Sequence, residues 1–510
     1  MRRYCLTLLF LFLFLSASLA TAQDLASFEK RITVKTLPNG LTLVVCERHE
    51  APVFSFFTRV DAGSAQDPKG ESGLAHMFEH MAFKGTDKIG TKNYAAEKLA
   101  LQKVEDAYRA YLHERLKRVS ANESKIEAAK KAWQTAIEEA NKYVAVNQFS
   151  EILERNGAEN MNAQTSEDET DYFYSLPANR LELWAYMESE RFLHPVMREF
   201  YKERDVVYEE RRMRVDSDPI GRLVEQFQAE AFMVHPYHNQ SIGWPSEIET
   251  FSATDADSFF KKYYVPSNMV VTVVGDVTPQ QVVPLVEKYF GRLPETPKPE
   301  PLRAVEPPQR AERRVVLHEA SQPLYIEGYH RPDYRDPDDA VYDVISDLLS
   351  SGRTSRLYRA LVRDKKIAAQ AAGFTDYPGV EYPNLFAFFA IPGRGHNPQE
   401  IEQAMHVEID RLVNQDVSDE ELKMVKTRLR ADLIRGLADN EGLAQQLGSF
   451  QALYGDWRYL FRQLDRYDSV TKADVRRVAA KTFVPENRTI GVTENQAPPA
   501  SPKAGQGANQ

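Results

Sequence analysis

Cysteine is almost absent from this chain, which has two in 510 residues, Cys5 and Cys46. Cys5 lies in the leader described below, so the processed chain keeps one cysteine and cannot form an internal disulfide. Its stability must therefore come from packed cores, which two domains of ordinary size supply. Cys46 follows Val44 and Val45, and this context predicts a small core residue on a strand.

A basic stripe is also missing. The chain carries 64 Lys and Arg against 74 Asp and Glu, a formal net charge of −10. Removal of Arg2 and Arg3 with the leader makes the charge −12 (−10 − 2). An acidic chain of this kind argues against nucleic-acid binding. No Walker-type loop, dinucleotide fingerprint or cysteine cluster is present either.

Long apolar runs are confined to the start of the chain. Arg2 and Arg3 precede the apolar residues 8–15, and Ala20-Thr21-Ala22 follows. This order predicts that residues 1–22 are a secretory signal peptide, cleaved after Ala22. The apolar core is too short to cross a membrane, and no later segment approaches a span. We therefore expect a periplasmic or secreted protein.

The most informative motif is His76-Met-Phe-Glu79-His80. Residues three and four apart share one face of a helix, so both imidazoles and the carboxylate project together. Two imidazoles suit Zn²⁺, and the adjacent carboxylate can take a proton from water. The order is the reverse of His-Glu-x-x-His and is the inverzincin signature. With 11 His in the chain, chance would produce it in roughly one or two such chains per hundred, so it needs independent support.

The remaining patterns place this motif in a mixed α/β chain. We expect strands at 32–36 and 41–45, joined by an Asn-Gly turn, and a strand at 54–60. The motif helix should begin near residue 72 and end near 83. Residues 94–155 lack Gly and Pro and show helical periodicity, which predicts a long helical hairpin turning near 120–122. Further patterns predict strands at 170–176 and 269–275 and helices at 180–191, 199–213 and 279–290.

The two halves of the chain look related. The sequence Lys262-Tyr-Tyr-Val-Pro-Ser-Asn268 corresponds to Lys481-Thr-Phe-Val-Pro-Glu-Asn487, and Asp67-Pro68 corresponds to Asp336-Pro337. Counting from each proline, the positions of the metal motif fall on core-type residues in the second half: Ile345, Leu348 and Leu349. Six prolines between residues 291 and 312 predict a stiff linker. We therefore expect domains at 23–292 and 313–496, a linker at 293–312 and a disordered tail at 497–510.

Zinc requires a third protein ligand. The helix that contains Glu209 and Glu210 offers two candidates, and residue spacing alone does not choose between them. His235 and His238 lie in His-Pro-Tyr-His, a loop context more typical of packing or surface residues than of metal ligands.

Four blocks in this order resemble the pitrilysin/insulinase family of inverted-motif zinc metallopeptidases, in its bacterial processing-peptidase-like branch: 76–80, Asn162-Ala-Gln-Thr-Ser, 203–210 and 235–244. The resemblance implies Glu210 as the third ligand and Glu203 as a carboxylate that supports the site, with Glu209 facing solvent. His80 and Glu210 are 130 positions apart (210 − 80), more than is usual in the family, and we read the helical hairpin as an insertion that accounts for the excess.

The resemblance also implies where substrate binds. Asn162 and Ala163 match the family's edge strand, which pairs with a peptide backbone; the less favoured alternative is a simple turn into the next strand. Arg363 matches a substrate-contacting arginine of the second domain or is a solvated helix charge. Gln370 stands where the family usually has tyrosine. Either the enzyme works without this tyrosine, or a companion subunit supplies it. The second alternative predicts a heterodimer with a homologous subunit without zinc, or a homodimer.

These observations predict an α+β fold of two homologous α/β sandwich-type domains that form a clam-shell, with the hairpin inserted in the first. The predicted function is a zinc metalloendopeptidase acting on peptides or unfolded polypeptides, with Glu79 as the general base. The alternative is a non-catalytic peptide-binding or structural subunit of the same fold. A metal-dependent hydrolase of another substrate class is disfavoured by the predicted strand-pairing segment.

Overall fold

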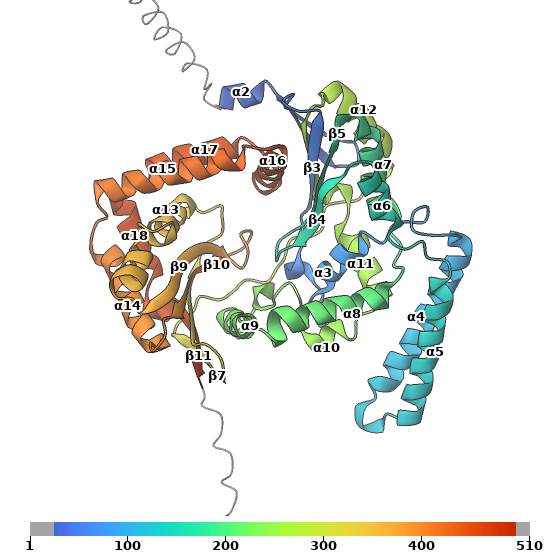
Figure 1. Cartoon of the computed structure of the whole chain (residues 1–510), viewed down its shortest axis with the longest axis horizontal. Helices are drawn as coiled ribbons and strands as arrows, with labels where there is room; N and C mark the ends of the chain where they lie inside the picture. Colours follow the sequence, from blue (N-terminus) through green and yellow to red (C-terminus); the bar gives the residue numbers. More distant parts are fainter. Residues whose placement is uncertain (1–24, 496–510) are drawn as a thin grey trace, which may run out of the picture.

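The computed structural model describes residues 25–495, so the predicted signal peptide and C-terminal tail lie outside the described residues. The chain folds around two β-sheets, one in each half (Figure 1). The first sheet has the strand order β1-β2-β6-β3-β5-β4. Its strands are β1 (Ile32–Thr36), β2 (Thr42–Glu47), β3 (Val53–Val60), β4 (Glu159–Thr165), β5 (Thr170–Pro177) and β6 (Met269–Gly275).

The second sheet repeats the first. Its order is β7-β11-β8-β10-β9, formed by β7 (Arg313–Glu319), β8 (Leu324–Arg331), β9 (Ala368–Tyr377), β10 (Asn384–Pro392) and β11 (Arg488–Asn495). In both sheets one pair is parallel, β2 with β6 and β7 with β11, and the next three pairs are antiparallel. The predicted fold of two homologous α/β domains is therefore confirmed.

The asparagine at the end of the sequence repeat makes equivalent hydrogen bonds in the two halves. The Asn268 amide donates to the backbone oxygens of Tyr263 and Asp61 at 3.0 and 2.9 Å. The Asn487 amide donates to those of Thr482 and His330 at 3.0 and 2.8 Å. Each asparagine thus ties the end of a helix to a neighbouring strand immediately before its own strand, β6 or β11, enters the sheet.

Helices cover both faces of each sheet. One face of the first sheet packs against α3 (Leu74–Met81), α7 (Leu181–Leu193), α11 (Ala253–Tyr263) and α12 (Pro279–Tyr289). The second packs against α13 (Asp339–Ser350), α14 (Pro398–Asn414) and α18 (Lys472–Thr482). Helix α13 holds Ile345, Leu348 and Leu349, all buried, at the positions that correspond to the metal motif.

The halves also exchange one helix each. Helix α16 (Asn440–Tyr454) from the second half lies on the other face of the first sheet, where Gly448 allows close approach to Phe57. Helix α9 (Pro219–Ala231) from the first half lies on the second sheet, where Phe227 packs over Gly328. Because β6 is covered on both faces, its near-continuous apolar sequence is explained.

The predicted hairpin is present as α4 (Tyr94–Arg115) and α5 (Glu123–Asn141), followed by α6 (Gln148–Arg155). It extends away from both sheets in Figure 1. Along its length Trp133 stacks on Tyr111 and packs against Tyr201 of α8 (Phe200–Arg211). The Arg204 guanidinium lies over the rings of Tyr108, Trp133 and Tyr201. This packing fixes the hairpin to α8.

Residues 293–312 contain neither helix nor strand, and we propose them as the connection between the two halves. The other helices are α2 (Leu25–Glu29), α10 (Pro245–Ile248), α15 (Asp419–Gly436) and α17 (Tyr459–Ser469). Among the described residues no helix combines the length and apolar character needed to span a bilayer. Cys46 is buried on β2, as its apolar context predicts.

Candidate metal centre

Three side chains from α3 and α8 converge on one point. The Nε2 atoms of His76 and His80 lie 3.7 and 3.5 Å from Oε2 of Glu210. The three potential ligand atoms lie within 4.8 Å of one another, and no other such group of three occurs in residues 25–495. The imidazole rings are 4.9 Å apart and nearly perpendicular. The two helices thus bring together residues that are more than a hundred positions apart in sequence.

These spacings fit a shared metal ion better than direct hydrogen bonds. Hydrogen bonds between nitrogen and oxygen are typically ~2.7–3.2 Å long. Two ligand atoms, each ~2.1 Å from a tetrahedral zinc ion, are about 3.4 Å apart. The distances from Glu210 to both imidazoles lie close to this second value. Two nitrogens and one carboxylate oxygen also form the donor set of a catalytic zinc site with an open position.

The start of α3 is fixed by backbone constraints. The Asp67 carboxylate accepts hydrogen bonds from the backbone N–H groups of Gly73 and Ala75, at 2.7 and 2.8 Å. Gly73 has a φ of 94°, and a side chain there would meet the Ile242 carbonyl oxygen. Gly243 faces it, and a Cβ on that residue would overlap the Ser72 backbone. This contact sets the direction in which α3 presents His76 and His80.

Glu79 lies beside the three ligand candidates and is held by strand β4. The Thr165 hydroxyl donates to Glu79 Oε2 at 2.6 Å. Burial raises the pKa of Glu79, and the Thr165 hydrogen bond partly offsets this because it favours the ionised form. A buried carboxylate with a raised pKa and a fixed orientation is suited to accept and return a proton near neutral pH.

A second carboxylate, that of Glu203, lies near the other ring nitrogen of His80. Glu203 Oε2 lies 3.6 Å from His80 Nδ1, and Lys84 forms an ion pair with the same carboxylate. Burial opposes charge on Glu203, but His80 and Lys84 outweigh it and lower the pKa of Glu203. Such a carboxylate orients the imidazole and makes it a better ligand.

The electrostatics of the two histidines differ. Burial lowers the pKa of His76 to about 4, so its imidazole is neutral, as ligation requires. Burial also acts on His80, but Glu203 and Glu210 raise its pKa to about 9. Contact with His80 lowers the pKa of Glu210, and Arg214 pairs with its other oxygen at 2.9 Å. Glu203 and Glu210 therefore favour a positive charge at the His80 imidazole.

The other polar candidates lie elsewhere. Glu209 is exposed and pairs with Arg212. His235 is buried away from the triad, where its Nδ1 accepts the Tyr237 backbone N–H at 3.3 Å. His238 forms part of the short 3₁₀ turn that follows. None of them belongs to the cluster of possible ligands.

The predicted substrate residues are divided between the halves. Asn162 and Ala163 lie on β4, the edge strand of the first sheet and the strand that carries Thr165. Arg363 lies in the second half, exposed and paired with Asp364. Gln370 is exposed on β9, the edge strand of the second sheet. No contact joins Arg363 or Gln370 to the triad in the described structure.

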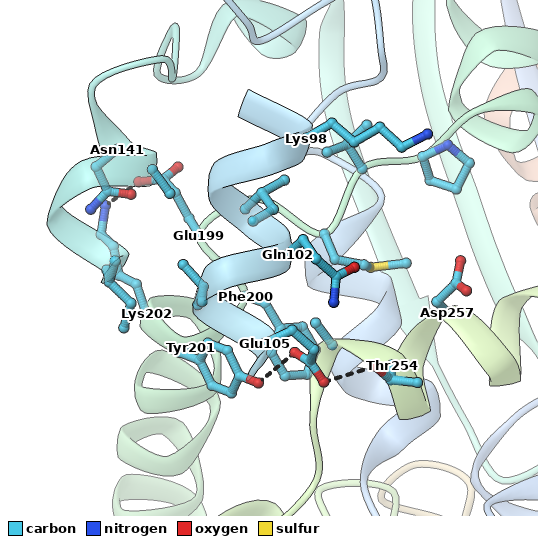
Figure 2. A pocket seen from close by; sticks show the side chains of 18 of the residues that line it. Lys98, Gln102, Glu105, Asn141, Glu199, Phe200, Tyr201, Lys202, Thr254 and Asp257 are labelled. Atoms are coloured by element: carbon cyan, nitrogen blue, oxygen red, sulfur yellow. Dashed lines mark hydrogen bonds and ion pairs between the residues drawn. The ribbon is translucent and has the colours of Figure 1, made fainter. Parts of the chain in front are cut away.

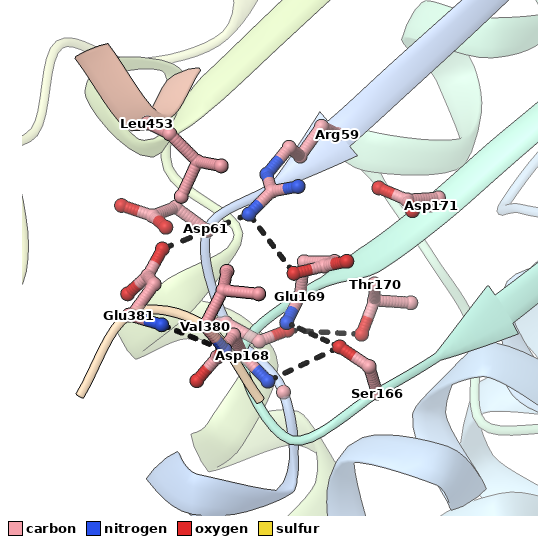
Figure 3. Close-up of polar contacts among 12 residues, drawn as sticks. Arg59, Asp61, Ser166, Asp168, Glu169, Thr170, Asp171, Val380, Glu381 and Leu453 are labelled. Carbon is pink, nitrogen blue, oxygen red and sulfur yellow. Dashed lines mark hydrogen bonds and ion pairs between the residues drawn. The ribbon is translucent and has the colours of Figure 1, made fainter. Parts of the chain in front are cut away.

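The turn after β4 ties the first half to the second (Figure 3). The Asp168 carboxylate accepts the backbone N–H groups of Val380 and Glu381 at 2.6 and 3.1 Å and the Tyr237 hydroxyl at 2.5 Å. Arg59 on β3 lies 2.9 Å from Glu169 and 3.7 Å from Glu381. The loop of the second half therefore contacts the segment that carries Thr165 to Glu79.

Sequence reasoning missed Thr165, Lys84 and Asp67 as parts of this site. Thr165 lies inside the block 162–166 that was recognised, but its side-chain direction follows only from the pairing of β4 with β5. Lys84 follows the end of α3 closely enough to be a candidate ion-pair partner for a carboxylate of the site. Asp67 was visible only as part of the repeated Asp-Pro pair.

The chain is similar to known proteins in both sequence and structure. The family model described as insulinase (peptidase family M16) matches residues 43–118, and the one described as peptidase M16 inactive domain matches residues 250–429. The chain is 29% identical over 462 residues to the zinc protease PqqE of Helicobacter pylori, covering 88% of this chain and 89% of that protein.

More distant relatives and solved structures extend the match. A probable mitochondrial-processing peptidase subunit beta of Arabidopsis thaliana is 23% identical, covering 90% of this chain and 77% of that protein. The crystal structure of a protease from Helicobacter pylori superposes with a TM-score of 0.76 at 26% identity, covering 91% of this chain and 99% of that one. The chain belongs to the pitrilysin/insulinase family of peptidases.

Proposed function

We propose that this protein is a zinc-dependent metalloendopeptidase that cleaves peptides or unfolded polypeptides. The observation that carries the proposal is the approach of His76, His80 and Glu210 at metal-site spacing with Glu79 beside them. Relatives named as zinc proteases, and the chain's membership of a peptidase family, support it.

Each residue of the site has a distinct role. His76 Nε2, His80 Nε2 and Glu210 Oε2 would hold the zinc, and Glu203 would orient His80. When bound, zinc supplies Lewis acidity that activates water and polarises a peptide carbonyl. Glu79 takes the proton of the attacking water on its carboxylate and gives it to the leaving amine. Thr165 keeps that carboxylate aimed at the reacting groups.

The substrate would bind as an added strand. Strand β4 has no partner on its outer side within the described sheet, and it leads directly to the Thr165 contact with Glu79. A peptide paired along Asn162 and Ala163 would pass beside the proposed base. Extended, unfolded chains can make this contact, whereas folded ones hide their backbone. We also propose that Arg363, exposed on the second half, contacts the substrate.

The protein is proposed to act in the periplasm or after secretion, as its N-terminal sequence predicts. We also propose assembly with a homologous subunit, as a heterodimer or a homodimer. Two observations support assembly: Gln370 stands at the family's tyrosine position, and one relative is named a subunit of a processing peptidase.

The decisive experiment compares wild type with Glu79→Gln on an unstructured fluorogenic peptide. Glutamine cannot accept the proton, so we expect turnover to fall by on the order of 10²-fold or more while zinc content stays at one ion per chain. Equal cleavage by both proteins would remove Glu79 from the mechanism. Wild-type protein that binds zinc and peptide but does not cleave would instead establish the non-catalytic alternative.

Two variants at adjacent positions test the assignment of Glu210, rather than Glu209, as the third zinc ligand. Glu210→Gln should lose zinc in metal analysis after dialysis, because a carboxamide is a poor ligand for this ion. Glu209→Gln should keep it, since Glu209 faces solvent and pairs only with Arg212. Equal zinc content in the two variants would contradict the proposed donor set.

A further inference from the structure

A cavity of about 300 Å³ lies at the base of the hairpin insertion, and none of the three ligand candidates lines it (Figure 2). Its walls come from α4, α5, the segment 195–199 that leads into α8, the first turn of α8 and the start of α11. This volume falls at the lower end of the range for small-molecule sites, ~300–1,000 Å³. Nothing in the proposed peptidase chemistry uses this space.

Much of the wall is apolar. Val104 and Ala140 line it from the two hairpin helices, Val196 from the segment before α8, and Phe200 from the first turn of α8; all four are buried. Ile137 adds a further aliphatic surface. A ligand that fills the cavity must therefore carry a hydrocarbon portion, since burial of apolar surface is its main source of binding free energy.

The carboxylates of the wall already have partners. Glu105 accepts hydrogen bonds from the hydroxyls of Tyr201 and Thr254, both at 2.8 Å (Figure 2). Glu199 pairs with Lys202 at 2.9 Å and lies 3.8 Å from Lys84. The third carboxylate, that of Asp257, forms an ion pair with Lys261.

One cation of the wall is unpaired. Lys98 lines the cavity from α4, and within residues 25–495 its ammonium has no hydrogen-bond or ion-pair partner. In Figure 2 its side chain extends along the upper edge of the cavity. A single free positive charge beside an apolar wall favours a ligand with one negative charge. A more highly charged anion such as phosphate would be repelled by the carboxylates around it.

We propose that this cavity binds an apolar monocarboxylate, whose carboxylate pairs with Lys98 and whose hydrocarbon portion contacts Val104, Ile137 and Phe200. Two sources share this chemistry: a free medium-chain fatty acid, and the C-terminal residue of a short apolar peptide. The site does not depend on zinc or on peptide cleavage, so it is testable whatever the outcome at Glu79.

The test is calorimetric titration of the full-length protein with decanoate, decanol and decylamine, kept below micelle formation. N-acetylphenylalanine and its amide represent the peptide source. We expect saturable binding of one carboxylate per chain, at least tenfold tighter than that of the matching alcohol or amide. Preference for decanoate assigns the fatty-acid source, and preference for N-acetylphenylalanine the peptide source; either supports the proposal.

Lys98→Glu should weaken carboxylate binding at least tenfold. Its matched control is Lys103→Glu, an exposed lysine of the same helix outside the cavity wall. Both positions are exposed, so thermal melting should show intact folds. Three results would each overturn the proposal: no carboxylate binds, decanol binds as tightly as decanoate, or Lys98→Glu binds as tightly as Lys103→Glu.

Discussion

Arg198 and Glu97 form a bidentate ion pair that is almost completely buried, with side chains 1% and 0% exposed. The same guanidinium donates to the backbone oxygens of Lys84, Thr86 and Ile89. Arg198 thus joins the α4–α5 hairpin, the loop that follows α3 and the segment that leads into α8. The hairpin therefore helps to position α3 and α8, which carry the ligand candidates.

Glu97→Gln should destabilise the protein strongly, because it leaves the Arg198 charge buried without a counter-ion. We expect the free energy of unfolding to fall by about 3–5 kcal/mol, measured by urea denaturation. Glu127→Gln on the exposed face of the same hairpin should change it by less than about 0.5 kcal/mol. A similar small effect at both positions would show that the Arg198 charge reaches solvent.

Gly73→Ala should disturb the start of α3 and the metal site with it. Alanine is strained at a φ of 94°, and its Cβ would lie 2.7 Å from the Ile242 carbonyl oxygen. The control is Gly70→Ala, which has a similar φ of 88° but no atom within 4 Å of an added Cβ. The control should cost only the conformational strain, about 1–2 kcal/mol. Gly73→Ala should cost more and lower zinc content; equal effects would exclude the steric contact.

Thr165→Val should move the acid limb of the pH–activity profile upward. The hydroxyl favours ionised Glu79, so its loss raises the pKa of the base and protonates it at higher pH. A hydrogen bond to a charged group contributes ~1.5–3 kcal/mol, enough to move the limb measurably. Thr165→Ser should restore the limb, and zinc content should not change. An unshifted limb would separate Thr165 from catalysis.

His235 should make stability depend on pH. Burial lowers its pKa from 6.5 to about 4, so between these values the unfolded chain binds a proton that the folded chain does not. The free energy of unfolding therefore decreases as pH falls through this interval, by about 3 kcal/mol in total. His235→Gln should flatten this dependence in urea denaturation at pH 4–7. The exposed His113→Gln should leave it unchanged; the opposite result would locate the effect elsewhere.

The elements that sequence predicted well are those fixed by neighbouring residues. The hairpin turn between α4 and α5, the Asn39-Gly40 turn and the buried strand β6 follow from local composition and periodicity. The repeat marked by Asn268 and Asn487 also came from sequence, because each asparagine performs the same task in its own half.

What sequence alone determined is the common face of His76, Glu79 and His80, since a helix of 3.6 residues per turn places them there wherever it lies. Tertiary structure decided how close Glu210 comes to both imidazoles, which carboxylate supports His80, and which hydroxyl holds Glu79. It also decided the exchange of α9 and α16 between the sheets. These contacts join distant segments, and long-range packing rather than local periodicity sets their distances.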